Sequence, residues 1–430
     1  MTVERAIARE IADRRLDGAD EQKRLQNLAP RSVKEEPAHP HMPAGGDPGP
    51  EGLALRRQYL RDLGHSLDAL SIDTGEDLPP LIENHIGHAR IPIGVIGPLR
   101  INGGAAHGDY HVPLANSEGA LVASYNRGAY AITRSGGAAS LCLTEVVSRA
   151  PCFCFASMAE SLRFLSWVLE HFEAFRTIAA GTTRHGKLTD MRTSLIGKEV
   201  YLIFDYHTGD AAGQNMVTFA TDAICRHLVA ESPVPPERWY IEGNLSGDKK
   251  ATMLSYLYAR GRKAIAEVEL PAKVLSRILH TNAREMVRYW EISFLGGTQS
   301  GSIGVQGHYA NALAALFTAC GQDIACVSEA SVGLTRMEAR ADDSLYVSVV
   351  LPNLIVGTVG GGTGLPTARE CLDMIGCRGE GGARKFAEIC AATVLAGEIS
   401  IIAAMAAGQF ADAHRRLGRP HRKAPETPAS

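Results

Sequence analysis

The clearest strand in the sequence reads Glu199-Val200-Tyr201-Leu202-Ile203-Phe204-Asp205-Tyr206. A turn at 208–213 follows it. Next comes a helix from Gln214 to about Ala230, whose apolar face carries Val217, Ala220, Ile224 and Leu228. The first N–H groups of such a helix have no partners within it and attract anions. The segment is therefore typical of an anion-binding turn. No GxGxxG motif follows a strand, so an ordinary Rossmann domain is not indicated.

A second segment combines adjacent positive charges with glycine. It reads Gly243-Asn244-Leu245-Ser246-Gly247-Asp248-Lys249-Lys250 and precedes a run that predicts a helix over Ala251–Arg260. Neighbouring ammonium groups repel each other. The arrangement therefore favours a function in which a lysine meets an anion, or an oxygen that becomes anionic during a reaction. The alternative is a solvated lysine pair in a turn, the commoner interpretation of an isolated Asp-Lys-Lys.

Three ionisable residues in other segments are candidates for proton transfer. Glu118 is the lone charge of Pro113–Gly119 and precedes an apolar run, so we expect it to be neutral near pH 7 and to donate a proton. Asp323 has a similar setting in Ala319–Ala325, and His414 is followed by two arginines that keep its pKa low enough for proton exchange. Taken singly, each is more often a helix cap, a buried structural carboxylate or a surface histidine.

The composition is that of a globular protein. The chain has 430 residues, 45% of them hydrophobic, which is enough for two or three domains. Its net charge of -3 predicts no affinity for nucleic acid or anionic membranes. The 9 cysteines form no CxxC pair, and the first residues lack an apolar signal segment, so we expect a cytoplasmic protein without a metal site. Cys390–Phe410, charged only at Glu398, predicts a buried core helix rather than a membrane span.

The N-terminal part is expected to differ from the rest. Residues 1–28 predict a surface helix, and residues 29–52 are rich in proline and glycine, a composition typical of linkers. Leu53–Leu70 predicts a further helix with an apolar stripe. Residues 1–52 are therefore predicted to lie outside the main domains.

Further motifs occur in one order along the chain. They are Glu83–Gly87 with Ile91–Leu99, Asn116–Gly119 with Leu121–Gly128, Gly209–Met216, Gly301–Gly304 and Gly357–Thr363. With the lysine segment, they make the chain from about Leu81 to Arg419 resemble the class I 3-hydroxy-3-methylglutaryl-CoA reductase family. The resemblance implies an α+β fold. Residues 53–149 and 241–430 would form a large acyl-CoA-binding domain, and residues 150–240 an inserted, small, ferredoxin-like NADP-binding domain.

The resemblance also implies an NADPH-dependent, four-electron reduction of the acyl-CoA thioester, through a hemithioacetal and an aldehyde, to mevalonate. Lys249 matches the lysine that stabilises the oxyanion, and Asp323 the aspartate that tunes its pKa. Glu118 matches the acid that protonates the carbonyl oxygen, and His414 the histidine that protonates the CoA thiolate. In the family the lysine loop reaches a neighbour's carboxylates, so a homo-oligomer is implied.

Other positions match binding residues of the family. A guanidinium at Arg184 or Arg419 suits a 2′-phosphate, which favours NADPH over NADH. The implied substrate-binding residues are Ser124, Asn126, Arg127, Arg149, Asp248, Lys250 and Asn311. The implied cofactor-binding residues are Thr183, Arg184, Asp210, Gly213, Asn215, Met216, Gly361 and Arg419.

The sequence departs from the family around the acyl group. Glu242 stands where a serine touches the substrate's free carboxylate, and carboxylates about 4 Å apart repel by roughly 1 to 4 kcal/mol. Ile292 stands where a lysine is expected, unless Arg288 substitutes for it after a slip of one turn, and Gln409 replaces a histidine. Ala413 replaces the phosphorylatable serine of some relatives. Two alternatives therefore stay open: a reductase of a different acyl-CoA thioester, and a non-catalytic CoA- or nucleotide-binding homologue.

Overall fold

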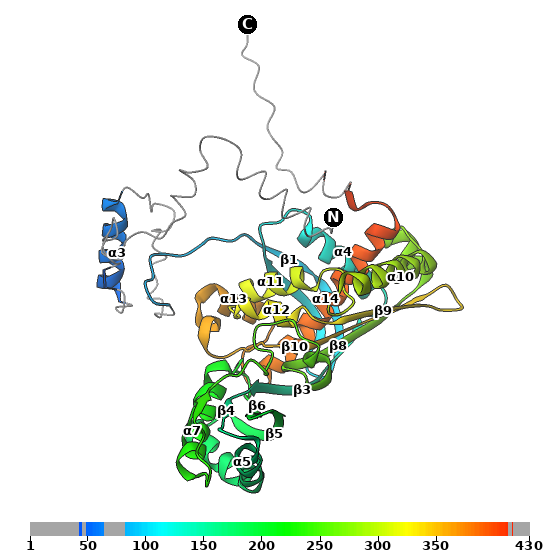
Figure 1. Cartoon of the computed structure of the whole chain (residues 1–430). Helices are drawn as coiled ribbons and strands as arrows, with labels where there is room; N and C mark the ends of the chain where they lie inside the picture. The colour runs from blue at the N-terminus through cyan, green and yellow to red at the C-terminus, as the bar shows by residue number, and fades with distance from the viewer. Residues whose placement is uncertain (1–42, 45–48, 64–81, 412–414, 416–430) are drawn as a thin grey trace, which may run out of the picture. The chain divides into compact units, whose positions relative to one another are not determined.

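The computed structural model describes residues 43–44, 49–63, 82–411 and 415 (Figure 1). The helix expected over residues 1–28, His414 and Arg419 lie outside these ranges. The chain divides into two compact units, residues 1–74 with 82–88, and residues 75–81 with 89–430. In the first unit, α3 (Pro50–Asp62) is the described part of the helix expected over Leu53–Leu70. The buried Arg56 of α3 donates from Nε to the carbonyl oxygen of His85 at 2.9 Å.

The second unit is built on a mixed sheet with strand order β7-β4-β6-β3-β8-β10-β9. Strand β1 pairs in parallel with β3 and antiparallel with β2, and β5 pairs with β6. The strands are β1 (Ile93–Gly103), β2 (His107–Ala115), β3 (Ala138–Arg149), β4 (Cys152–Cys154), β5 (Lys187–Ile196), β6 (Glu199–His207), β7 (Arg238–Tyr240), β8 (Gly261–Leu270), β9 (Leu334–Ala339) and β10 (Leu345–Leu354).

Helices cover this sheet and complete the α+β fold, which confirms the expected fold class. They are α4 (Leu121–Arg134), α5 (Met158–Glu170), α6 (Phe172–Thr182), α7 (Gln214–Glu231), α8 (Leu254–Tyr258), α9 (Ala272–Val274), α10 (Ala283–Ser300), α11 (Tyr309–Ala319), α12 (Val327–Ala330), α13 (Pro366–Met374) and α14 (Gly382–Ala406). Short helical turns of other types are η1 (Leu275–Leu279), η2 (Ile324–Cys326) and η3 (Gly361–Gly364).

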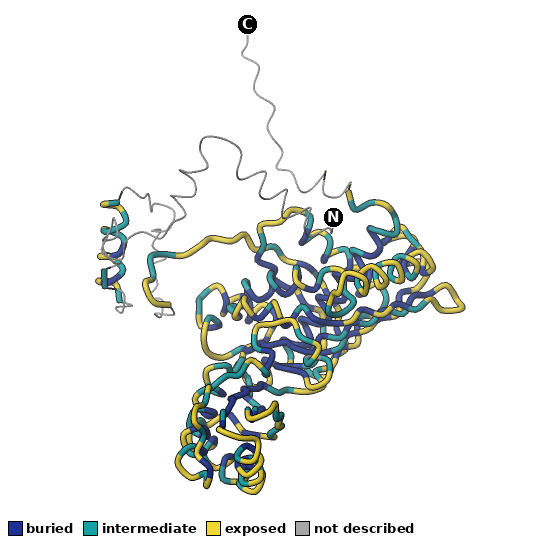
Figure 2. The backbone as a smooth tube through the Cα atoms, in the orientation of Figure 1, coloured by how far each residue is buried: buried dark blue, intermediate teal, exposed yellow. Residues whose placement is uncertain are grey.

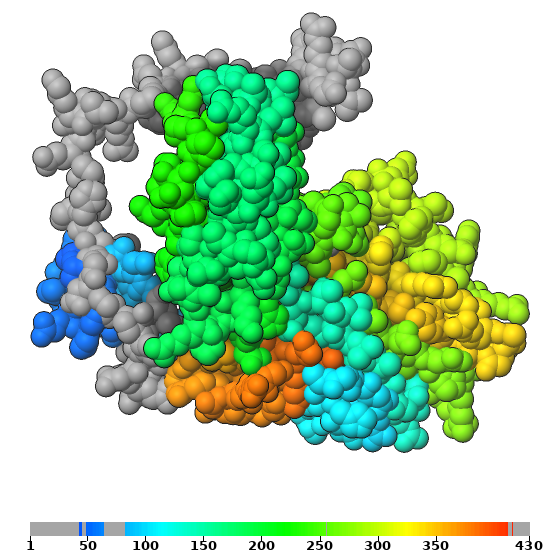
Figure 3. Space-filling model, turned by 90° about the horizontal axis from the view of Figure 1, so that it is seen from below, coloured from blue at the N-terminus to red at the C-terminus, as the bar shows by residue number. Residues whose placement is uncertain are grey.

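The segment from β4 to β7 has a ferredoxin-like arrangement. Its strands lie in the order β7-β4-β6-β5, every neighbouring pair is antiparallel, and helices fall between β4 and β5 and between β6 and β7. Aromatic residues fill its core, with the ring centroids of Phe155 and Phe164 4.8 Å apart. In the space-filling view this segment stands out from the rest of its unit as one block (Figure 3). The expected strand, turn and helix are confirmed as β6 and α7, and the predicted apolar face of α7 is buried.

Helix α14 runs through the centre of the remaining part and is the most continuously buried element (Figure 2). Its length and composition alone would suit a membrane span, but 83% of its most apolar window is buried inside the protein. The expected core helix is thereby confirmed. It ends at Ala406 rather than at the expected Phe410, because Gly408 adopts a left-handed backbone (φ 66°) that stops the helix.

Candidate active site

The lysine segment forms a loop between β7 and α8 and brings Lys249 against Asp323. The Lys249 Nζ lies 2.8 Å from the Asp323 Oδ2, with 42% and 40% of the two side chains exposed. Asp323 begins η2, and its other oxygen accepts from the N–H of Ala325 at 3.1 Å. The hydrogen bond from Lys249 to Asp323 raises the pKa of the lysine, so the ammonium is held charged and in a fixed place.

The backbone of this loop turns left-handed at three residues, and the helix expected after the loop is shorter than predicted. Asn244, Gly247 and Lys249 all have positive φ, and Lys249 stands at φ 55°. Only Leu254–Tyr258 forms helix α8, so the prediction of a helix over Ala251–Arg260 was wrong at both ends. Lys250, the other lysine, donates from Nζ to the carbonyl oxygen of its neighbour Asp248 at 2.8 Å.

Arg149 at the end of β3 joins two carboxylates of this region. Its Nη1 lies 3.3 Å from the Glu242 Oε2 and 3.2 Å from the Asp248 Oδ2, with only 9% of the arginine side chain exposed. Glu242 also accepts from the Ser246 hydroxyl at 2.9 Å and from the N–H of Ala150 at 3.3 Å. Glu242 is therefore partnered by an arginine of its own chain.

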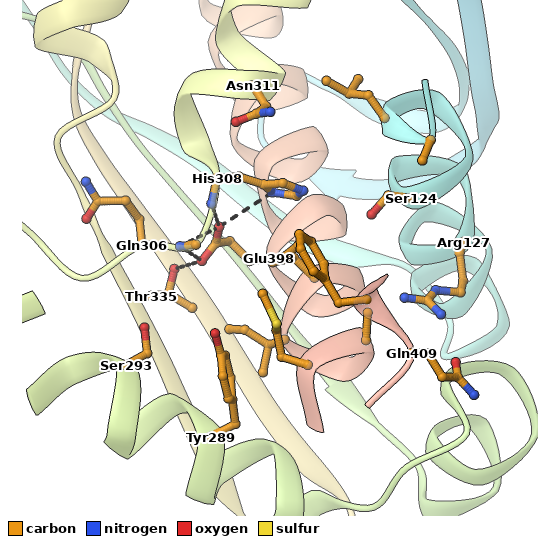
Figure 4. Close-up of a pocket in the computed structure, with 18 of the residues that line it drawn as sticks. Ser124, Arg127, Tyr289, Ser293, Gln306, His308, Asn311, Thr335, Glu398 and Gln409 are labelled. Atoms are coloured by element: carbon orange, nitrogen blue, oxygen red, sulfur yellow. Dashed lines mark hydrogen bonds and ion pairs between the residues drawn. The ribbon is translucent and has the colours of Figure 1, made fainter. Parts of the chain in front are cut away.

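A pocket of about 870 Å³ opens beside α4, α10, α11 and α14 (Figure 4). Ser124 and Arg127 of α4 lie across the pocket from Tyr289 and Ser293 of α10, and Asn311 enters from α11. The structure thus brings together four predicted residues that line this pocket: Glu118, Ser124, Arg127 and Asn311.

The contacts of these residues show how they are held. The Glu118 Oε2 accepts from the Asn311 amide at 3.2 Å. Arg127 donates from Nη2 to the carbonyl oxygen of Ser400 at 2.7 Å. Asn126 instead accepts from the N–H of Gly97 at 2.9 Å, where the register of β1 shifts between Ile96 and Leu99. Glu118 is exposed, so the apolar surroundings expected from its sequence neighbours are missing around it in the single chain.

Glu398 and His308 are two of the pocket residues to which the sequence analysis assigned no role. Glu398 of α14 is fully buried and accepts from the N–H of Gly307, the N–H of His308 and the Thr335 hydroxyl, the last two at 2.7 Å. Burial raises the pKa of Glu398 and lowers that of His308 to about 4, so the imidazole is neutral near pH 7. The sequence does carry a signal for this cluster: Glu398 is the lone charge of an apolar helix. A carboxylate buried in such a helix needs several hydrogen-bond donors around it.

Several predicted cofactor residues meet where α6 ends and α7 begins. Gly186 packs so closely between Met216 and Thr183 that a Cβ there would overlap both side chains. Arg184 is exposed beside Thr183, and Asn215 is exposed in the first turn of α7. Gly213 precedes α7 with φ 82°, which suits glycine, and a Cβ there would overlap Thr208.

Asp210 and Gly361 lie at a neighbouring junction. The Asp210 carboxylate accepts from the N–H groups of Gly381 and Ala383, at 3.0 and 2.9 Å, and so holds the first turn of α14. A bridge between Ala211 and Val359 pairs the 209–213 loop with the glycine-rich turn that contains the exposed Gly361.

The structure also locates the residues that depart from the family pattern. Ile292 is exposed on α10, and Gln409 lines the pocket. Arg288, the possible substitute for the missing lysine, is 67% exposed on α10 and lies 3.3 Å from the Glu291 carboxylate in the single chain. Tyr289 and Ser293, one helical turn apart, occupy the pocket side instead.

Comparisons with known proteins identify relatives of the chain. A sequence model described as hydroxymethylglutaryl-coenzyme A reductase matches residues 53–419. The chain is 42% identical over 408 residues to a 3-hydroxy-3-methylglutaryl-coenzyme A reductase of Aeropyrum pernix, covering 92% of this chain and 96% of that protein. It is 43% identical over 354 residues to the enzyme of Methanocaldococcus jannaschii, covering 81% and 87%. A class II reductase of Streptococcus pneumoniae, solved with NADPH bound, shares the fold with a TM-score of 0.61 at 19% identity, over 76% of this chain and 87% of that one.

Proposed function

The chain belongs to the hydroxymethylglutaryl-coenzyme A reductase family, and we propose that it reduces 3-hydroxy-3-methylglutaryl-CoA to mevalonate and CoA with two molecules of NADPH. The Lys249–Asp323 pair is the observation that carries this proposal. Each hydride addition to a carbonyl carbon leaves an anionic oxygen, and a fixed ammonium stabilises that oxygen more than the neutral carbonyl. Glu118 would protonate the oxygen, and His414 the thiolate of departing CoA.

The pair forms within one chain, whereas the resemblance implied a lysine reaching a neighbour's carboxylates. Among the contacts of the described residues, none joins Glu118 to Lys249. We propose that the protein is a homo-oligomer of class I type, in which association completes the surroundings of Glu118.

The domain assignment follows the same proposal. Residues 150–240 would bind NADPH, residues 53–149 and 241–430 would bind the acyl-CoA, and residues 1–52 would lie outside both. We also propose a cytoplasmic location. The burial of α14 supports only that its most apolar segment packs within the protein rather than in a membrane.

The identity of the acyl group is tested by substitution of Glu242. Glu242 forms an ion pair with Arg149. The guanidinium of Arg149 is suited to bind the free carboxylate of the substrate, so Glu242 competes with that carboxylate. Glu242→Ser is therefore expected to lower the KM for 3-hydroxy-3-methylglutaryl-CoA about fivefold, a change of about 1 kcal/mol. Inhibition by butyryl-CoA, which lacks that carboxylate, is the control and should not change. An unchanged or higher KM would show that Glu242 does not compete with the substrate.

The preference for NADPH over NADH is tested by substitution of Arg184. Arg184→Ala is expected to raise the KM for NADPH about tenfold and to leave the KM for NADH nearly unchanged, because a charge-assisted contact with the 2′-phosphate is lost. Arg226→Ala is the matched control, since Arg226 lies on α7 in the same domain and pairs with Asp222 at 2.7 Å. Wild-type preference for NADH would overturn the assignment of Arg184.

The function is tested by NADPH oxidation with a panel of acyl-CoA thioesters. Oxidation that requires 3-hydroxy-3-methylglutaryl-CoA supports the proposal, and oxidation with another thioester instead would favour the alternative of a different acyl group. Binding of CoA and NADPH without oxidation would identify a non-catalytic homologue.

A further inference from the structure

Glu329 of α12 is a buried carboxylate beside the lysine loop. It is 1% exposed, and burial raises its pKa in spite of the neighbouring arginine. Arg260, 3% exposed, holds both of its oxygens from Nη1 at 2.6 Å each. Asn353 of β10 bonds to the backbone of both residues of this ion pair. It accepts from the N–H of Arg260 at 2.9 Å and donates to the carbonyl oxygen of Glu329 at 3.3 Å. The ion pair is therefore anchored to the sheet.

This anchored pair reaches the loop at two points. The Glu329 Oε1 accepts from the backbone N–H of Lys249 at 3.1 Å. The Arg260 Nη2 lies 2.9 Å from the Asp248 Oδ1, on the residue before the lysine. Both contacts fall where the backbone turns left-handed at Lys249, a conformation that a residue with a Cβ rarely adopts unless its surroundings impose it.

We propose that Glu329 is a positioning residue for Lys249: held by Arg260, it fixes the lysine backbone so that the ammonium stays on Asp323. The expected effect on turnover rests on the proposed function, whereas the contacts of Glu329 with Arg260 and with the Lys249 backbone are present without substrate. A neutral side chain at this position keeps at most one of the two oxygens that Arg260 holds, so it is no longer fixed by an ion pair. The left-handed turn then loosens, and the Lys249 Nζ leaves the Asp323 carboxylate. The groups that face this ammonium are Asp323 and Cys326 from around η2 and Asp248 from its own loop.

The test measures the Lys249 side chain directly. Acetic anhydride labelling across a pH series, read by peptide mass spectrometry with Lys250 as the internal reference, gives the pH midpoint of Lys249 acetylation. In E329Q this midpoint is expected to fall by about half a pH unit or more, because the ammonium loses its carboxylate. E388Q is the matched control: Glu388 is also 1% exposed and accepts from backbone N–H groups, those of Ala105, Ala106 and Cys142. It should lose thermal stability without a shift of the Lys249 midpoint.

An unchanged midpoint in E329Q, or an equal shift in E388Q, would overturn the inference. If E329Q does not fold, R260K is measured in its place, with the same expected direction, because a lysine cannot hold both Glu329 oxygens and Asp248 together. With 3-hydroxy-3-methylglutaryl-CoA, E329Q should lower kcat about tenfold at an unchanged KM, as expected for a group that acts on the transition state. An inactive wild type would refute the proposed function while the labelling still decides the role of Glu329.

Discussion

Replacement of Lys249 by alanine is expected to lower kcat by about 10² to 10³, the usual cost of removing a preorganised oxyanion stabiliser. The ammonium is already charged and fixed by Asp323 before substrate arrives, so it needs no rearrangement as charge develops. The KM for the acyl-CoA and the circular dichroism spectrum should change little, because the side chain is half-exposed and packs in no core.

Lys250→Ala is the matched comparison for this prediction. Lys250 is exposed and bonded only to a carbonyl oxygen of its own loop among the contacts described. Its loss should act chiefly on KM, as expected for a residue that contacts the bound substrate rather than the transition state. A Lys249→Ala enzyme that keeps more than about a tenth of wild-type kcat would contradict the oxyanion role.

Gly128→Ala is expected to be the most damaging small substitution for stability, at a cost of about 3 to 5 kcal/mol or a failure to fold. Gly128 is the point where α4 crosses α14, and a Cβ there would overlap the carbonyl oxygen of Ala396. Backbone on both helices leaves nothing flexible to move aside. The crossing also holds Ser124 and Arg127 against α14, so the pocket depends on it.

The measurement for this prediction is thermal unfolding followed by circular dichroism. Gly181→Ala is the matched control, because Gly181 is an exposed glycine of α6 with open space around its Cα. That change should leave stability unchanged or raise it by up to about 1 kcal/mol. A Gly128→Ala protein that melts with the wild type would show that the helices have room to separate.

Local periodicity was enough to predict β6 and α7, because alternation and helical spacing are properties of consecutive residues. The order of the strands in the ferredoxin-like segment followed only from the family resemblance, since no local pattern says which strands pair. The helix expected over Ala251–Arg260 is shorter than predicted in part because Ala259 turns left-handed (φ 56°) directly after α8, and no local pattern in the sequence marks an alanine for that conformation.

In the candidate site, too, some features were predictable from the sequence and others depend on contacts between distant residues. Lys249 and Asp323, picked out from separate segments, form the predicted pair. Glu242 was interpreted as an unfavourable neighbour for a carboxylate, and the arginine that partners it comes from β3, 93 residues earlier. Glu329 and Arg260 carry no local signal at all, because a buried ion pair is recognisable only when both partners and their burial are known.

The central claim is that this chain carries out both hydride transfers to one thioester carbon. Its most direct test is the stoichiometry of a single reaction: NADPH consumed, free CoA thiol released, and product identified by mass spectrometry. Two NADPH per CoA, with mevalonate as the product and no reaction in the Lys249→Ala protein, is the predicted result. One NADPH per CoA with an aldehyde as the product, or no oxidation with 3-hydroxy-3-methylglutaryl-CoA while another thioester is reduced, would contradict it.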